Sequence, residues 1–73
     1  MQSQRADTVA KVVELSSQST TSFQDALERG VMRANQTLKN LRGAWVKEHE
    51  LCIENGKIVA YRVIMKVTFV LDE

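Results

Sequence analysis

The segment ENGKI, residues Glu54–Ile58, determines the fold of this chain. Its Asn55-Gly56 pair supplies two residues that tolerate positive φ, which is what the two-residue type I′ turn of a β-hairpin requires. The residues after the turn are rich in β-branched and aromatic side chains, as is typical of strands. The sequence therefore predicts a long antiparallel hairpin with strands at residues 44–54 and 57–71.

A two-residue turn also predicts which residues of the two strands lie opposite one another. The predicted pairs are Glu54 with Lys57, His49 with Arg62, and Trp45 with Lys66. In this register one face of the later strand is almost entirely apolar and should pack on a helix. Its residues are Val59, Tyr61, Val63, Met65, Val67, Phe69 and Leu71. The opposite face then gathers Trp45, His49, Arg62 and Lys66.

Residues 20–40 carry apolar side chains at three- and four-residue steps, which predicts an amphipathic helix. The apolar stripe consists of Phe23, Leu27, Val31, Ala34, Leu38 and Leu41. Two pairs at its start have the residue types of a helix cap, Ser19 with Ser22 and Thr21 with Gln24, and the second pair has capping-box spacing. Gly30 lies inside the helix, where glycine costs about 1 kcal/mol relative to alanine. It is either tolerated there or marks the close approach of another backbone, such as that of a second subunit.

Residues 8–15, TVAKVVEL, are β-branched and roughly alternating, which predicts a first strand. The polar residues 1–7 are expected to form a flexible tail, and residues 8–73 a single domain. The fold class is therefore α+β, with a β-α-β-β order, a three-stranded antiparallel sheet and one helix. The second face of the sheet has no helix to cover its apolar residues, so we expect it to serve an interface or a ligand.

Glu48 and Glu50 fit this arrangement badly, because the predicted register turns both carboxylates towards the helix. Either the strand extends past the helix, or it twists or bulges. A β-bulge would also shift the pairing beyond it by one residue.

The composition excludes several classes of protein. The chain has 73 residues with one cysteine, Cys52, and one histidine, His49, so an internal disulfide cannot form and a conventional zinc site lacks ligands. A net charge of +1 gives no basic surface for nucleic acid, and no apolar run is long enough for a membrane span. The lone cysteine and the polar N-terminus are typical of the cytoplasm. A domain of this size buries only a small core, so we expect self-association to stabilise it.

Several ordered segments make the chain resemble the dodecin family. They are KVVEL at residues 11–15, the SxxSF turn at 19–23, RANQTLKNL at 33–41, ENGKI at 54–58 and YRVIMKVTFVLD at 61–72. The resemblance implies a three-stranded sheet wrapped around one helix, and a hollow homododecamer built from such subunits. It further implies a non-catalytic storage protein that holds riboflavin or FMN in stacked pairs, sandwiched by a tryptophan at the start of the second strand.

The residues at the implied flavin site differ from the pattern of the flavin-binding dodecins. Where that pattern reads L-x-W-F-E-V after the helix, this chain reads LRGAWV at residues 41–46. Gly43 therefore stands at the tryptophan position, and Trp45 follows on the same strand face, about 6.8 Å further along. The strand-three glutamine that meets the flavin ring is replaced by Arg62. We expect weak or no riboflavin binding, with Trp45, Gly43 and Arg62 as the candidate ligand-binding residues.

Other roles compete with flavin binding at these positions. Trp45 is either a stacking platform or part of a subunit interface. Arg62 either contacts a ligand or forms a salt bridge with Glu48 or Glu50 of a neighbouring subunit. Dodecins that lack the tryptophan and carry the arginine are associated with calcium, so the resemblance makes calcium the alternative ligand.

A calcium site would need carboxylates from several chains, because calcium takes six to eight oxygen ligands. The available groups are Glu48, Glu50, Asp72 and Glu73, which otherwise form a solvated acidic edge, and no metal site is expected within one chain. No Ser-His-Asp order, paired carboxylates or phosphate-binding loop is visible, so we do not expect an enzyme.

Overall fold

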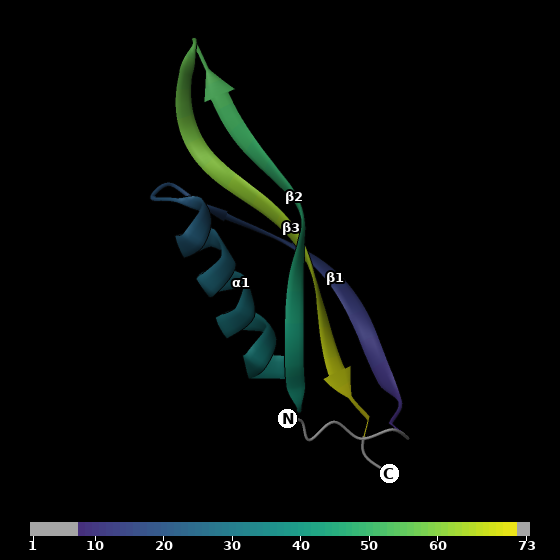
Figure 1. The fold of residues 1–73 in the computed structure, drawn as a ribbon. Coiled ribbons are helices and arrows are strands. Elements are labelled where there is room, and N and C mark those ends of the chain that lie inside the picture. The colour runs from purple at the N-terminus through teal and green to yellow at the C-terminus, as the bar shows by residue number, and fades with distance from the viewer. Residues whose placement is uncertain (1–7, 72–73) are drawn as a thin grey trace.

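The computed structural model describes residues 8–71, which fold as three strands and one helix (Figure 1). The elements are β1 (Ala10–Ser19), α1 (Phe23–Thr37), β2 (Leu41–Glu54) and β3 (Lys57–Val70). The strands form one antiparallel sheet in the order β1-β3-β2, and α1 packs on one of its faces. This arrangement confirms the predicted α+β fold class. The predicted tail at residues 1–7 lies outside the described residues.

The hairpin turn forms where the sequence predicts it. Asn55 and Gly56 both adopt positive φ, at 51° and 75°, and Glu54 lies opposite Lys57. The first strand is longer than predicted and reaches Ser19, because the polar residues 16–19 pair with residues 61–64 of β3. Cross-strand hydrogen bonding thus extends the strand through a segment whose composition favours a turn.

The helix is shorter than the predicted range of residues 20–40, and its start is fixed by serines. Ser22 is the N-cap, and its Oγ accepts a 2.9 Å hydrogen bond from the backbone N–H of Asp25. The buried Ser19 hydroxyl accepts bonds from the N–H groups of Thr21 and Ser22 and donates a 2.6 Å bond to the Asp25 carboxylate. The Ser19–Ser22 pair therefore organises the cap. Thr21 and Gln24 do not, because the helix begins after Ser22.

The core lies between α1 and the middle of β3. Its fully buried members are Ala26, Ala34, Val63, Met65 and Val67. The predicted apolar face of the later strand is confirmed for Val63, Met65 and Val67, which are buried. Its two end residues, Val59 and Leu71, are each 41% exposed.

Gly30 marks a close approach between the helix and the sheet of the same chain. A Cβ atom at this position would lie 2.8 Å from Met65 Cε and 3.2 Å from Ser17 Cβ. The nearest atoms within this chain are side chains of β1 and β3. The helix can therefore approach the sheet this closely because residue 30 has no side chain.

The turn end of the β2–β3 hairpin projects beyond α1 and β1 (Figure 1). Four of its apolar residues are more than 40% exposed: Leu51, Ile53, Ile58 and Val59. The described part of the chain contains no helix that is both long and apolar enough to span a membrane. The single helix thus leaves one end of the hairpin without an apolar partner.

We predict that Gly56→Ala destabilises the fold by about 1 kcal/mol, because a side chain disfavours positive φ. No atom lies within 4 Å of the added Cβ, so the cost comes from the backbone alone. Asn55→Gly is the matched control, since glycine tolerates the positive φ at that position. Urea midpoints measured at one protein concentration test this, and an unchanged midpoint for Gly56→Ala would contradict it.

A second prediction concerns acid stability. The Ser19 hydroxyl lowers the pKa of the Asp25 carboxyl by donating a hydrogen bond to it, and Arg29 lowers that pKa further through a 2.6 Å N–H bond and its charge. A carboxyl whose pKa is lowered by folding stabilises the fold above its unfolded pKa of about 3.9, and this contribution is lost as the pH falls through the folded value.

Asp25→Asn should therefore reduce stability near neutral pH and show a smaller further loss on acidification than the wild-type chain. Glu28→Gln, on the same helix, is the control and should follow the wild-type pH dependence. Urea midpoints across the acid range provide the measurement. An Asp25→Asn profile parallel to that of the wild type would show that the Asp25 contacts contribute nothing.

Candidate ligand-binding face

The candidate site is the sheet face that points away from α1, called the open face here. Alternate residues of a strand point to opposite sides, and Val63, Met65 and Val67 face the helix. The residues between them, with their cross-strand partners, therefore belong to the open face. Its residues include Glu14 and Gln18 of β1, Gly43, Trp45, Glu48 and Glu50 of β2, and Arg62, Ile64, Lys66 and Thr68 of β3.

An extra residue in β2, Lys47, resolves the misfit of the two glutamates. Val46 lies opposite Met65, but Glu48 lies opposite Ile64, so Lys47 has no partner on β3. This bulge turns Glu48 and Glu50 onto the open face, where their carboxylates remain solvated. Both alternatives raised by the sequence are present: the hairpin extends past the helix, and β2 also bulges.

The predicted pairing of His49 with Arg62 is wrong, because an extra residue in β3 near the turn, Val59, shifts the register by one residue. His49 instead lies opposite Val63 on the helix side, and its ring packs edge-to-face on Phe23 with a centroid distance of 4.8 Å. Arg62 lies opposite Glu50. The predicted cluster on the open face thus loses His49 and gains a carboxylate.

A second irregularity offsets the first. Near the turn Ile53 lies opposite Ile58, but Cys52 lies opposite Ala60, so Val59 is an extra residue in β3. The extra residues stand on different strands, and their shifts cancel beyond Lys47. The predicted pairing of Trp45 with Lys66 is therefore confirmed.

Arg62 is held by residues from both neighbouring strands. Its Nη1 donates a 3.1 Å hydrogen bond to Glu50 Oε1, and its Nε donates a 3.3 Å bond to Gln18 Oε1. The Cys52 thiol approaches the same Gln18 oxygen at 3.8 Å. The predicted salt bridge of Arg62 thus forms with Glu50 of its own chain, and a neighbouring subunit is not needed for it.

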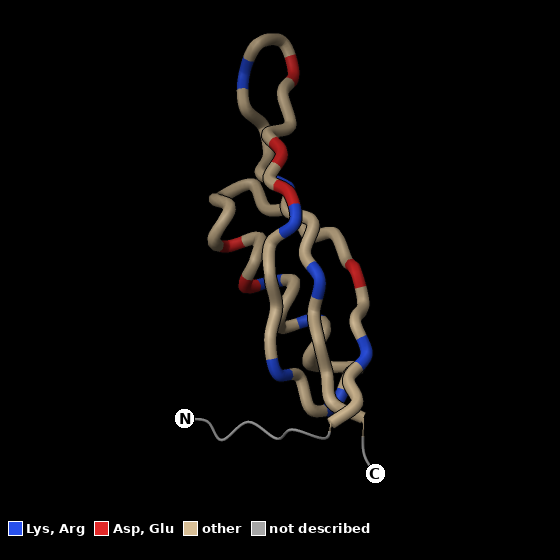
Figure 2. The backbone as a smooth tube through the Cα atoms, turned by 45° about the vertical axis from the view of Figure 1, so that its right-hand side comes forward, with Lys and Arg blue, Asp and Glu red and all other residues tan. Residues whose placement is uncertain are grey.

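Trp45 lies on the open face and is 49% exposed, so it does not belong to the core. The Lys66 ammonium stands 6.0 Å from the centroid of its ring, at the limit of a cation–π contact. The neighbouring Lys47 pairs with Glu14 across the sheet at 3.5 Å. Figure 2 shows residues of both charge signs along the strands.

Gly43 shares the open face with Trp45, as predicted. Thr68, which lies opposite Gly43, donates a 3.3 Å hydrogen bond from its hydroxyl to the Gly43 carbonyl. Arg62 is more distant, because it stands four residues before Lys66 on β3, or about 14 Å along the strand. The structure therefore brings Gly43 and Trp45 together and places Arg62 two pleats away.

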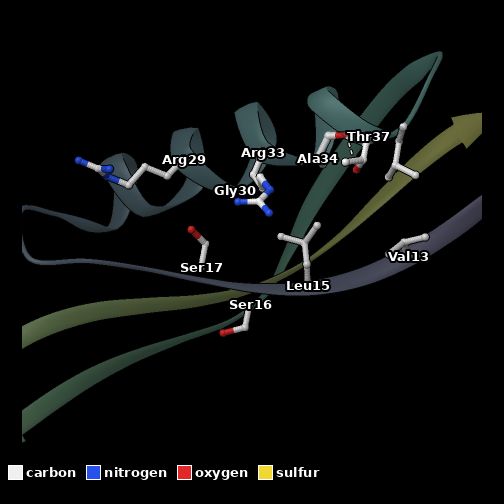
Figure 3. A pocket seen from close by; sticks show the side chains of 10 residues that line it. Val13, Leu15, Ser16, Ser17, Arg29, Gly30, Arg33, Ala34 and Thr37 are labelled. Atoms are coloured by element: carbon white, nitrogen blue, oxygen red, sulfur yellow. Dashed lines mark hydrogen bonds between the residues drawn. The ribbon is translucent and has the colours of Figure 1, made fainter.

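A separate cleft of about 340 Å³ lies between α1 and β1 and contains none of the predicted site residues (Figure 3). Leu15 and Ala34 contribute apolar surface to it, while Arg33 and the Ser17 hydroxyl add polar groups. It arises where the helix passes over the edge strand, so only tertiary packing reveals it. The residues that line it are Val13, Leu15, Ser16, Ser17, Arg29, Gly30, Arg33, Ala34, Thr37 and Leu38.

Two residues of the open face were missed by sequence reasoning. Gln18 lies beyond the predicted end of the first strand, and Glu50 was placed on the helix side. The alternation that continues through SSQS is the signal that places Gln18, whereas nothing in the sequence announces the bulge at Lys47. Among residues 8–71 no three His, Cys, Asp or Glu side chains gather as metal ligands, and Asp72 and Glu73 lie outside this range.

Comparisons with known proteins agree with this architecture. The family model described as Dodecin matches residues 9–72. A curated relative, the calcium dodecin of Mycobacterium tuberculosis, is 30% identical over 61 residues, which cover 84% of this chain and 86% of that protein.

Solved structures give the same result. The dodecin from Streptomyces davaonensis is 34% identical with a TM-score of 0.86, covering 93% of this chain and 100% of its own. The dodecin from Streptomyces coelicolor is 29% identical with a TM-score of 0.88, covering 94% and 99%.

Proposed function

Because the chain belongs to the dodecin family, we propose that it is a non-catalytic small-ligand-binding and storage protein that assembles as a hollow homododecamer. Its ligand is a planar ring of the flavin type, riboflavin or FMN, held on the open face. The observation that carries this proposal is the half-exposed Trp45 on a sheet face that no helix covers. An exposed indole offers a flat apolar surface on which a ring can stack.

Three residues have assigned roles in this proposal. Trp45 stacks on the ring, and Gly43 leaves room beside it because it carries no side chain. Arg62 approaches the polar edge of the ring, since a guanidinium donates hydrogen bonds in a planar fork. The single free thiol, Cys52, is consistent with function in the reducing cytoplasm.

Assembly into a shell follows from the apolar surface that one subunit leaves exposed. The projecting end of the hairpin carries four exposed apolar residues, and Trp45 adds to this surface on the open face. A chain of this size needs such surface to be buried, because its own core is small. Neighbouring copies of the chain are the partners we propose.

We predict that the purified protein sediments as an assembly of about twelve 8.3 kDa chains. Analytical ultracentrifugation measures the mass, and light scattering checks it independently. Ile53→Glu, at the projecting end of the hairpin, should weaken the assembly because burying an unpaired carboxylate is costly. Glu54→Gln at the turn is the matched control. A monomer at all concentrations would refute the proposed shell.

We predict weak binding of riboflavin that depends on Trp45. Titration with the protein should quench the fluorescence of riboflavin, and Trp45→Ala should weaken the affinity by about tenfold through the loss of ring stacking. Trp45→Phe is the control and should retain part of the affinity because it keeps an aromatic face. Equal quenching by the wild-type chain and Trp45→Ala would contradict this role.

A second candidate ligand is calcium, favoured by the position of Glu48 and Glu50 together on the open face. Two carboxylates supply fewer oxygens than calcium requires, so copies of the chain would have to share the ion. The relative from Mycobacterium tuberculosis is itself named calcium dodecin. A melting temperature raised by calcium but unaffected by riboflavin, with loss of the effect in Glu48→Gln, would favour this candidate over flavin.

A further inference from the structure

The cleft between α1 and β1 lies on the helix side of the sheet, and the proposed flavin site on the open face does not use it (Figure 3). The two elements are joined by the turn after Ser19 and diverge towards the C-terminal end of the helix (Figure 1). The cleft volume of about 340 Å³ falls within the range of about 300–1,000 Å³ that is usual for small-molecule sites. The cleft therefore has room for a small ligand.

The charge at the rim of the cleft comes from arginine alone. Its lining includes Arg29 and Arg33 but no aspartate or glutamate. Arg29 is neutralised by Asp25, which accepts a 2.6 Å hydrogen bond from its Nε. The Arg33 side chain forms no ion pair or hydrogen bond within residues 8–71. One unpaired positive charge thus borders the cleft, and it is complementary to an occupant with a single negative charge.

The polar groups of the cleft gather at one end. A long side chain on a helix leans towards the helix N-terminus, and Figure 3 shows the Arg33 guanidinium near Gly30, above Leu15. The partly buried Ser17 points its hydroxyl towards the helix at this end. A guanidinium and a hydroxyl therefore stand together as hydrogen-bond donors.

The opposite end of the cleft is apolar. It is lined there by Val13, Ala34 and Leu38, while Thr37, a polar residue at this end, donates its hydroxyl to the Ala34 carbonyl. This end also lies beside the C-terminus of α1, where the backbone carbonyls carry a partial negative charge that repels an anion. An anionic group is therefore favoured at the Arg33 end, and an apolar group at the other.

We propose that the α1–β1 cleft binds an amphipathic monocarboxylate, a linear apolar chain that ends in one carboxylate. Arg33 pairs with the carboxylate, and the Ser17 hydroxyl donates a hydrogen bond to it. The apolar chain lies over Leu15 and continues towards Val13 and Leu38. This site is separate from the flavin site of the proposed function, since the sheet lies between the two.

Neither part of such a ligand binds well alone. Arg33 is exposed, and an ion pair with an exposed arginine is worth little because water screens it. The apolar chain supplies the rest by covering side chains that the fold leaves only partly buried, Val13, Leu15 and Leu38. An acid without a chain, or a chain without an acid, should therefore bind much more weakly.

Isothermal titration calorimetry of the assembled protein with octanoate, acetate and 1-octanol tests the inference. Acetate keeps the charge without the chain, and 1-octanol keeps the chain without the charge. Octanoate should bind about tenfold more tightly than either. Arg33→Gln should remove the preference for octanoate over 1-octanol, and Arg33→Lys should retain part of it. Arg42→Gln, the same change on β2 outside the cleft, should keep the full preference.

Sedimentation confirms that each variant is assembled, and Arg33→Gln should fold because Arg33 is exposed and has no partner to lose. Saturating riboflavin should leave the affinity for octanoate unchanged. Absence of octanoate binding by the wild-type assembly, or equal binding by Arg33→Gln, would overturn the inference. Displacement of octanoate by riboflavin would overturn it as well, because that result would place octanoate on the open face. All of these outcomes leave the proposed function intact.

Discussion

Lys47, the extra residue in β2, determines which side chains of β2 face the helix and which lie on the open face. A regular strand would direct Glu48 and Glu50 towards the aromatic rings and the buried residues under α1, where an unpaired carboxylate is costly. Because of the bulge, the residues of β2 that would face the helix in a regular strand beyond Lys47 lie on the open face, and the alternate residues face the helix. Together with the extra residue Val59 in β3, the bulge lets His49 contact Phe23 and Glu50 lie opposite Arg62, while Trp45 stays on the open face. One local irregularity therefore links the packing of the helix side to the chemistry of the open face.

The lengths of the elements explain why so much of the sheet stays uncovered. The 15 residues of α1 span about 22 Å, whereas the 14 residues of β2 or β3 span about 46 Å. One helix can therefore cover only about half of the hairpin, even on the face that it occupies. The turn end and the open face must find other partners, and copies of the same chain supply them in the proposed shell.

Much of this structure was predictable from the sequence because the deciding signals are local. The positive φ values of Asn55 and Gly56 follow from residue type, and the helix stripe follows from its spacing. The extension of β1 to Ser19 was missed because pairing with β3 outweighs the turn preference of serine. The bulges were missed for a similar reason: they carry no glycine or proline signature, and the gain that selects them comes from contacts distant in sequence. Trp45 lies opposite Lys66, as predicted, only because the register shifts caused by Val59 and Lys47 are equal and opposite.

The surroundings of Trp45 also give a physical reason to expect weak flavin binding. The Lys66 ammonium stands over the indole at 6.0 Å, and no carboxylate in the described part of the chain forms a salt bridge with it. A ring that stacks on this face of Trp45 must displace the ammonium, which forgoes an attraction of about 0.5–1 kcal/mol at an exposed site. An uncharged flavin loses that amount outright. A flavin that carries a phosphate can recover it by pairing with Lys66, so the same lysine that weakens riboflavin binding favours FMN over riboflavin.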